Sequence, residues 1–567
     1  MNNKKLNKVL NKSSYIKLFS YTNSYKIKLT TIVISNILLS LSSVFIALMT
    51  KQLIDFAINS NFNKAIYYAS ITGFLFIFQL SITSFISIKT SILKETMRNN
   101  IQLNFMKTIY KKKWIDLSKY QSGDLITRIT SDTRNIVDVL VDIFPKQISL
   151  AIQLIFAFIV LSRYDKTLSF LAFIVAPIAV IVSWLIGKRL KPIQTQVQTT
   201  ESELRSYLTE AIQNFTLIRT FEYDEHSIKQ INATQEKKKK LIIKKTKISA
   251  LANAATGLGY RIGFFGAIGF GSYRLFTKAI TFGTFTAFLQ LVGQIQAPIQ
   301  GIARTIPRII VTLASVERID ALENLKNEIH IKSNSKTELI PTQIQFENIG
   351  FNYNENNSVL KNVSLTINKD EKIAFLGLSG EGKTTIIRLL LSLIEPHSGN
   401  LYLEFNDNSK TIFSKATRKY FSYVPQVNIL FSGTIKHNLQ LAKETMNPED
   451  IKKALDTACV TDFINDLPNG INTVVGERGI GLSQGQIQRI CIARALIHGS
   501  PFLILDEATS ALDIETEKKV IDNLNSNYKD LSIIAVTHRD PIIKICDSIY
   551  VLNDGILTKK IINKKIN

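Results

Sequence analysis

The chain has 567 residues, is 46% hydrophobic and carries a formal net charge of +24. This length exceeds that of one compact domain and predicts roughly two to four domains. The three cysteines show no framework spacing, so they argue against a disulfide scaffold and for a reduced cytosolic setting. The residue pattern contains no metal-ligand cluster. The basic N-terminus lacks a long apolar core, so no cleaved signal peptide is expected.

Six long apolar stretches in the first 310 residues predict six transmembrane helices. They cover residues 29–50, 65–88, 143–162, 167–186, 248–273 and 279–303. Each stretch is near or above the about 20 residues that an α-helix needs to cross a bilayer. Buried helices of a soluble core are the alternative, but six stretches of this length are hard to house in one.

Lys and Arg gather in two long loops between these stretches. Residues 89–139 contain ten and residues 187–247 contain thirteen, whereas the three short loops contain two each. Because such residues favour the cytoplasmic side, we expect the long loops, the N-terminal segment 1–28 and the C-terminal domain to face the cytoplasm. The basic run at 235–247 is interpreted as a surface beside anionic lipid, and nucleic acid is not expected as a partner.

Polar residues interrupt the last two predicted spans. Arg261 would cost about 2.5–3.5 kcal/mol if it faced lipid at mid-bilayer, so we expect it to face protein or a wet cavity. Gln290 and Gln294 are four residues apart and share one helical face. They either line a translocation path or join neighbouring helices, and the sequence leaves both interpretations open.

The predicted transmembrane domain spans 29–322, including helical extensions beyond the bilayer. A polar stretch over 323–342 is interpreted as a linker. Strand-like alternation begins at "IQFENIGFNY", and a separate C-terminal domain is expected over 343–560.

The C-terminal domain contains a phosphate-loop motif, "GLSGEGKTT", between an apolar strand pattern and a helical pattern. Gly380 and Gly382 free the backbone so that N–H groups can point at phosphate. Lys383 supplies a positive charge for the β- and γ-phosphates, and Thr384 supplies a hydroxyl for Mg²⁺. The other loop residues expected to bind the nucleotide are Gly377, Ser379, Glu381 and Thr385.

Two further strand patterns end in polar residues. "FLILDEATSALD" places Asp506 to hold Mg²⁺ and Glu507 to polarise an attacking water. "IIAVTHR" ends near His538, which is interpreted as a contact to the γ-phosphate. The alternatives are a solvated carboxylate pair and a structural histidine. The phosphate loop on the same domain favours the catalytic interpretation.

The stretch "LSQGQ" at 482–486 resembles the signature motif of the ATP-binding cassette (ABC) transporters, which is normally Leu-Ser-Gly-Gly-Gln. The loop elements "SGDLITRITSDT" and "EAIQNFTLIRTF" resemble exporter loops, so the resemblance covers nearly the whole chain. It implies an all-α six-helix transmembrane domain followed by an α/β P-loop NTPase domain.

The resemblance also implies roles for single residues. Tyr353 would stack on adenine, Gln426 would sense Mg²⁺, and Asp513 would lie in the loop that crosses the dimer. Glu507 would be the catalytic base and His538 the switch histidine. The signature residues expected to bind ATP held by a partner cassette are Ser483, Gly485 and Gln486.

Two positions depart from the family pattern. Gln484 replaces the usual Gly of the signature, which would be costly if the backbone there required φ > 0. This departure raises the possibility of a heterodimer with unequal sites. The residue before Glu371 is Asp370 rather than the usual Gly, which we interpret as a tolerated turn change.

The expected function is export of an unidentified lipid, drug or peptide, driven by ATP hydrolysis with Mg²⁺, by a homodimer or heterodimer of half-transporters. The expected location is the cell membrane of a bacterium, with several spans. An ATP-gated channel or a regulatory protein without pumping is the alternative. A soluble cassette ATPase and an importer are less compatible with six spans that precede the cassette.

Overall fold

The computed structural model describes residues 12–164, 190, 192–328, 339–354, 357–427, 429–445, 447–476, 479 and 481–560. The chain forms two compact units. One unit contains Met1–Ile109 and Gln121–Asn324, and the other contains Tyr110–Tyr120 and Leu325–Asn567. The segment at 110–120 therefore belongs to the second unit, although in the sequence it falls between two helical segments of the first.

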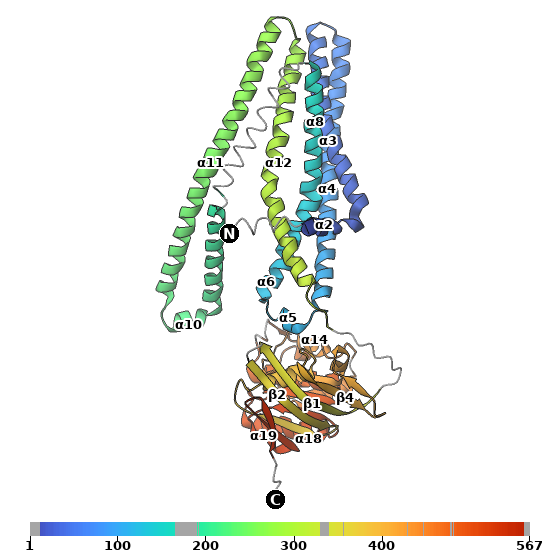
Figure 1. The fold of residues 1–567 in the computed structure, drawn as a ribbon, viewed down its shortest axis with the longest axis vertical. Coiled ribbons are helices and arrows are strands. Elements are labelled where there is room, and N and C mark those ends of the chain that lie inside the picture. Colours follow the sequence, from blue (N-terminus) through green and yellow to red (C-terminus); the bar gives the residue numbers. More distant parts are fainter. Residues whose placement is uncertain are drawn as a thin grey trace, which may run out of the picture. The chain divides into compact units, whose positions relative to one another are not determined.

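The described part of the first unit is helical. Its helices include α2 (Lys12–Ser20), η1 (Asn23–Tyr25), α3 (Lys26–Ile58), α4 (Phe62–Ile109), α6 (Ser122–Thr127), η2 (Arg128–Asp132), α7 (Thr133–Asp138), η3 (Val139–Ile143), α8 (Phe144–Tyr164), α10 (Phe215–Thr220), α11 (Asp224–Phe276) and α12 (Phe282–Glu323), and residues 192–213 are helical as well. Helices α3, α8 and α12 run side by side (Figure 1). Small side chains let them approach, since Ala47 and Ala157 are fully buried in one cluster with Leu291.

Among the described residues, three helices are long and apolar enough to cross a membrane: Ser13–Ile58, Phe62–Ile109 and Ser122–Tyr164. These contain the first three predicted spans. The fourth predicted span, 167–186, lies outside the described residues. The fifth falls within α11. Most of the sixth falls within α12, where Phe282–Ile295 is a shorter apolar helix.

Polar side chains join the helices of this bundle. The Nε2 of Gln294 on α12 donates to the backbone oxygen of Ser43 on α3 at 2.8 Å. Hydroxyls of Ser40 on α3 and Ser149 on α8 are 2.7 Å apart. Gln294 therefore acts as an interhelical contact, whereas Gln290 is exposed on this single chain.

The second unit contains a six-stranded sheet with the order β12-β11-β3-β10-β9-β6. The strands are β3 (Lys372–Leu376), β6 (Phe421–Val424), β9 (Phe502–Asp506), β10 (Ser532–Val536), β11 (Ser548–Asn553) and β12 (Ile556–Lys560). All neighbours pair in parallel except β11 and β12. Strands β9 and β10 are buried at every residue, as their continuous apolar sequences predict for a covered parallel sheet.

A second, antiparallel sheet has the order β2-β1-β4-β5, and β7 pairs with β8 in a two-stranded ribbon. The strands are β1 (Pro341–Asn354), β2 (Asn357–Asn368), β4 (Ser398–Phe405), β5 (Lys410–Ile412), β7 (Gly433–Thr434) and β8 (Val474–Val475). The helices are α5 (Trp114–Leu117), α13 (Lys383–Leu390), α14 (Ile435–Gln440), α15 (Pro448–Thr457), α16 (Thr461–Asn465), α17 (Gln484–His498), α18 (Ile514–Asn527) and α19 (Asp540–Ile545), with 3-10 turns η4 (Lys415–Tyr420) and η5 (Gly470–Asn472). The α13 helix packs between the two sheets in one hydrophobic cluster.

A buried carboxylate ties η2 to the lower part of α12. Asp132 is 1% exposed. Its Oδ2 accepts from Nε of Arg318 at 2.8 Å, and its Oδ1 accepts from the Ser315 hydroxyl at 2.8 Å. Because the Arg318 side chain is 43% exposed, it can be solvated if the pair is broken, whereas Asp132 cannot.

This difference in burial predicts which of two variants loses more folding stability. Arg318→Ala leaves a buried carboxylate with Ser315 alone and should cost about 1–3 kcal/mol. Asp132→Asn removes the buried charge and should cost less. Thermal unfolding in detergent should therefore show the larger loss for Arg318→Ala, with Lys239→Ala, which breaks an exposed ion pair, as the control. Equal losses for the two variants would contradict this account of the pair.

Candidate functional site

The phosphate loop connects β3 to α13 and has the backbone that its glycines predict. Gly380 and Gly382 have φ of +93° and +109°, which L side chains rarely adopt. A Cβ at Gly382 would also lie 2.9 Å from Cγ1 of Val359. The Nζ of Lys383 donates to the backbone oxygens of Gly377 and Leu378 at 2.5 and 2.9 Å, so the lysine folds back over its own loop.

Strand pairing brings the other motifs to the same edge. Val536 at the end of β10 pairs with Phe375 of β3 on one side and with Asp506 of β9 on the other. Because the strands are parallel, the residues that follow them leave from one edge of the sheet. His538 therefore lies beside the loop, and it lines a hollow of about 620 Å³ together with Gly377.

Two hydrogen bonds orient the carboxylates at this edge. The hydroxyl of Tyr423 donates to Oδ2 of Asp506 at 3.3 Å, and Nε2 of Gln426 donates to Oε2 of Glu507 at 2.8 Å. Glu507 has a φ of +48°, a left-handed conformation that few non-glycine residues adopt. Its N–H donates to the backbone oxygen of Val536 at 2.8 Å, which holds that conformation.

The charge state of Asp506 reflects opposing influences. Burial raises the pKa of this carboxyl, and the nearby negative charge of Glu507 raises it further. The hydrogen bond from Tyr423 and the positive charges of Arg388 and Lys383 lower that pKa. A buried carboxylate whose pKa is shifted by neighbouring charges is typical of a site that binds charged ligands.

The donor set at this edge fits Mg²⁺. The buried carboxylate of Asp506, the exposed hydroxyl of Thr384 and the amide of Gln426 are oxygen donors of the kind Mg²⁺ takes. In the part of the chain that the structure describes, no three His, Cys, Asp or Glu side chains converge as a metal cage. Mg²⁺ commonly uses one or two carboxylates together with substrate phosphates, which matches this small set.

Tyr353 on β1 lies beside α13, the helix that follows the phosphate loop. Its ring packs edge-on against Phe351 at 4.9 Å between centroids. Its hydroxyl is 3.3 Å from the hydroxyl of Thr385 and accepts from Nη1 of Arg388 at 2.6 Å. The residue is 39% exposed, so part of its side chain is open to solvent.

The signature motif begins α17. Ser483 is the N-cap, its hydroxyl accepting from the Gln486 N–H while the Gln486 side chain accepts from the Ser483 N–H. Gln484 is the first residue of the helix, so its backbone does not need a positive φ and the predicted cost does not arise. A Cβ at Gly485 would lie 3.1 Å from the backbone oxygen of Ala511, which favours glycine there.

Local backbone geometry also accounts for Asp370, the second departure from the family pattern, and for Asp513 of the loop expected to cross the dimer. Asp370 has a φ of +65°, the left-handed conformation that Gly usually fills and that Asp tolerates. Asp513 is the N-cap of α18, where its Oδ1 accepts from the Thr516 N–H at 2.9 Å. That bond lowers the pKa of the Asp513 carboxyl.

The signature helix and the phosphate-loop helix belong to different cores. Ile487 and Ile490 of α17 pack in one hydrophobic cluster, whereas Ile386 and Ile387 of α13 pack in the other. Ser483, at the start of α17, is exposed. The two anion-seeking helix starts are thus built on separate parts of the second unit.

Sequence reasoning did not find Tyr423 or Arg388. Tyr423 begins the stretch "YVPQ" that contains Gln426, but the motif gives it no role, and its contact with Asp506 depends on the pairing of β6 with β9. Arg388 lies five residues after Lys383 on α13, and it reaches Tyr353 only because β1 and α13 share a core. Neither contact has a signal in local sequence.

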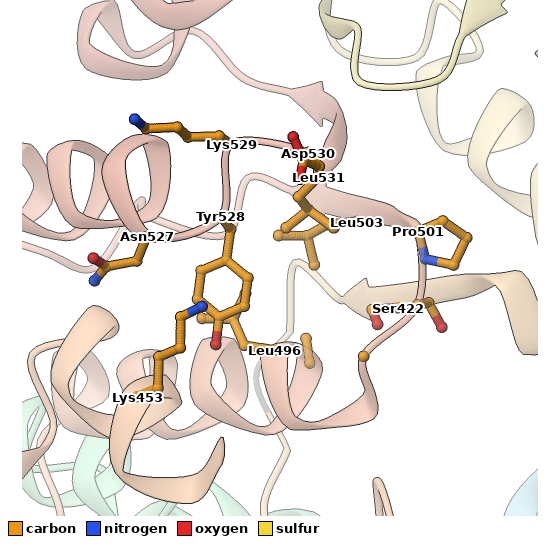
Figure 2. Close-up of a pocket in the computed structure, with 13 residues that line it drawn as sticks. Ser422, Lys453, Leu496, Pro501, Leu503, Asn527, Tyr528, Lys529, Asp530 and Leu531 are labelled. Carbon is orange, nitrogen blue, oxygen red and sulfur yellow. The ribbon is translucent and has the colours of Figure 1, made fainter. Parts of the chain in front are cut away.

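A separate pocket lies at the opposite end of the strands. It has a volume of about 340 Å³ and is lined by residues at the starts of β6, β9 and β10, including Ser422, Pro501 and Leu531 (Figure 2). The Lys453 ammonium lies 4.5 Å from the centroid of the Tyr528 ring in this pocket. Because the phosphate loop leaves the carboxyl ends of the strands, this pocket is not part of the candidate site.

Comparisons with known proteins match both halves of the chain. Residues 29–299 match the ABC transporter transmembrane region, and residues 360–510 match the ABC transporter domain. An ATP-dependent lipid A-core flippase of Syntrophus aciditrophicus is 31% identical over 449 residues, covering 79% of this chain and 74% of the relative. A Staphylococcus aureus protein named for multidrug export as an ATP-binding/permease protein is 28% identical, covering 94% of each chain.

A solved structure agrees in fold. A bacterial Atm1-family ABC exporter with ATP bound superposes with a TM-score of 0.79 at 21% identity, covering 94% of this chain and 95% of that one. The predicted fold class, a helical transmembrane domain followed by a P-loop ATPase domain, is confirmed by these matches. The chain belongs to the ABC exporter family, with the membrane region and the ATP-binding domain in one polypeptide.

Proposed function

We propose that this chain is one half of an ATP-driven exporter and that two copies clamp two ATP molecules between them. Each ATP would lie between the loop of Lys383 in one copy and the Ser483–Gly485 helix start of the other. The separation of α13 and α17 into different cores supports this arrangement most directly. One chain then supplies two anion-binding ends because each site takes one from each copy.

The residues at the sheet edge would divide the work of hydrolysis. Lys383 binds the β- and γ-phosphates, and Tyr353 stacks on adenine. Glu507 polarises the attacking water, and Gln426 orients that carboxylate through their 2.8 Å hydrogen bond. His538 contacts the γ-phosphate. Mg²⁺, when bound through Asp506 and Thr384, neutralises phosphate charge.

A homodimer is sufficient for this mechanism. Gln484 is exposed at the first turn of a regular helix, so it imposes no backbone strain on the signature. The residues expected to carry hydrolysis are all present in this chain. Gln484 therefore no longer favours a heterodimer with unequal sites.

The cargo is proposed only as a class, a lipid, drug or peptide. The similar proteins are named for lipid A-core and for multidrug export, which are unlike cargoes. Closure of the two cassettes on ATP would turn an inward-open cavity outward, and hydrolysis would reset it. A channel or regulator without pumping is disfavoured because the hydrolytic residues are present.

Replacing the catalytic carboxylate should separate ATP binding from turnover. Glu507→Gln keeps the size and the polar contact with Gln426 but cannot polarise water as a base. We expect steady-state ATP hydrolysis to fall by about 100-fold or more, with ATP binding retained. Lys383→Ala is the control that loses binding. Turnover of Glu507→Gln well above that control would contradict the role of Glu507.

Removing the Tyr423 hydroxyl should shift the pH dependence of hydrolysis. Asp506 must be ionised to bind Mg²⁺, so activity is lost as pH falls through its pKa. Because the Tyr423 hydrogen bond lowers that pKa, Tyr423→Phe should raise it and move the acidic limb of the pH–rate profile to higher pH. Tyr420→Phe is the control on the neighbouring turn. An unshifted acidic limb in Tyr423→Phe would contradict the assignment.

Transport itself needs a vesicle measurement. Reconstituted protein should move a fluorescent lipid or drug against its gradient only with hydrolysable ATP, and Glu507→Gln should not. Downhill flux that needs ATP binding but not hydrolysis would favour the channel alternative.

A further inference from the structure

Arg388 lies between two aromatic rings from distant parts of the sequence. The carbon of its guanidinium is 4.8 Å from the ring centroid of Trp114 and 5.8 Å from that of Tyr353. Its Nη1 also donates to the Tyr353 hydroxyl at 2.6 Å. One half-buried side chain on the phosphate-loop helix thus contacts the proposed adenine platform and α5 together.

The α5 segment is fixed to the second unit by several contacts besides Arg388. Nζ of Lys113 is 2.7 Å from a carboxylate oxygen of Glu395. Nζ of Lys112 donates to the backbone oxygen of Leu325 at 2.8 Å. Trp114 and Ile115 pack against the hydrophobic cluster that contains α13. Trp114 therefore has a defined place next to Arg388, although it comes from the loop between α4 and α6.

The Tyr353 ring depends on Arg388 for its orientation. Phe351 contacts the ring edge-on, and the Thr385 hydroxyl is 3.3 Å from the Tyr353 hydroxyl. The bond from Arg388 is shorter and carries a full charge, so it is the stronger of the two polar contacts. A guanidinium that holds the hydroxyl end of the ring limits rotation of the ring plane on which a base would stack.

We propose that Arg388 is a positioning residue that orients Tyr353 for adenine and reports occupancy of that ring to Trp114. The inference rests on the proposed function, in which Tyr353 binds the base. If the orientation that Arg388 favours is the one that accepts adenine, adenine must in turn favour the Arg388 contact, because coupling between two sites is reciprocal. Docking of α5 and recognition of the base are then linked through one side chain.

The role of Arg388 is separable from phosphate binding. The phosphates are held by the loop of Lys383, whereas Arg388 contacts the ring that would hold the base. Arg388→Ala should therefore weaken ATP binding by about 5- to 30-fold and leave binding of metal-free tripolyphosphate, which does not need Asp506, within about twofold. Arg388→Lys keeps the charge but loses the planar fork and should show a smaller loss of ATP affinity.

Trp114 provides the second readout. The sequence has two tryptophans, and Trp184→Phe leaves Trp114 as the only one. In this background, nonhydrolysable ATP should change the emission of Trp114, whereas tripolyphosphate should not. Arg388→Ala should abolish the change at saturating ATP. Tyr353→Phe, which removes the acceptor but keeps a stacking ring, should reduce it.

The matched control is Lys113→Ala, which weakens the attachment of the same segment through Glu395 but leaves Arg388 and Trp114 intact. It should keep the Trp114 response. If Lys113→Ala loses the response as fully as Arg388→Ala, the segment needs only general docking and the inference is overturned. A wild-type Trp114 that is silent while labelled ATP binds overturns the inference alone. Failure of the wild type to bind ATP overturns the proposed function as well.

Discussion

The pairing of β10 with both β3 and β9 is the contact on which the candidate site depends. It sets Phe375, Val536 and Asp506 side by side, so three parallel strands release their polar residues at one edge. The strands can lie together because their central residues are apolar and buried on both faces of the sheet. Once this register is formed, the phosphate loop, the carboxylates and His538 lie near one another because each follows directly from a strand end. A one-residue slip of β9 would turn Asp506 to the opposite face of the sheet.

The same sheet separates the two anion-seeking helix starts within one chain. The signature helix α17 belongs to the core on the other side of β9 from α13, and its N-cap is exposed. In the proposed dimer, the phosphate loop of a second cassette would lie against this exposed helix start. Arg388 joins parts of the chain that are distant in sequence. Its guanidinium contacts both Tyr353, the proposed base platform, and Trp114 of α5, a segment from a loop of the membrane half.

Much of the site could be predicted from sequence because each motif is local. Gly380 and Gly382 needed positive φ, and Asp506 and Glu507 followed an apolar strand, so chemistry and position were both visible. Contacts between motifs could not be predicted in this way. Tyr423 reaches Asp506 through strand pairing, and Trp114 reaches Arg388 across more than 270 residues of sequence. The strain considered for a non-glycine residue at position 484 does not arise, because the capping box of Ser483 and Gln486 makes Gln484 the first residue of a helix. The difference between Gln484 and the usual Gly does not by itself reveal this backbone conformation.

The central claim is that each ATP site takes half of its residues from each copy, and mixing two defective chains tests it most directly. Lys383→Ala has an intact signature, and a chain with Ser483→Arg and Gly485→Asp has an intact phosphate loop. Neither should hydrolyse ATP alone. Coexpressed and purified through two different tags, the mixed dimer should recover about half of the wild-type hydrolysis rate, because one of its two sites is whole. A mixed dimer no more active than either parent would contradict the account.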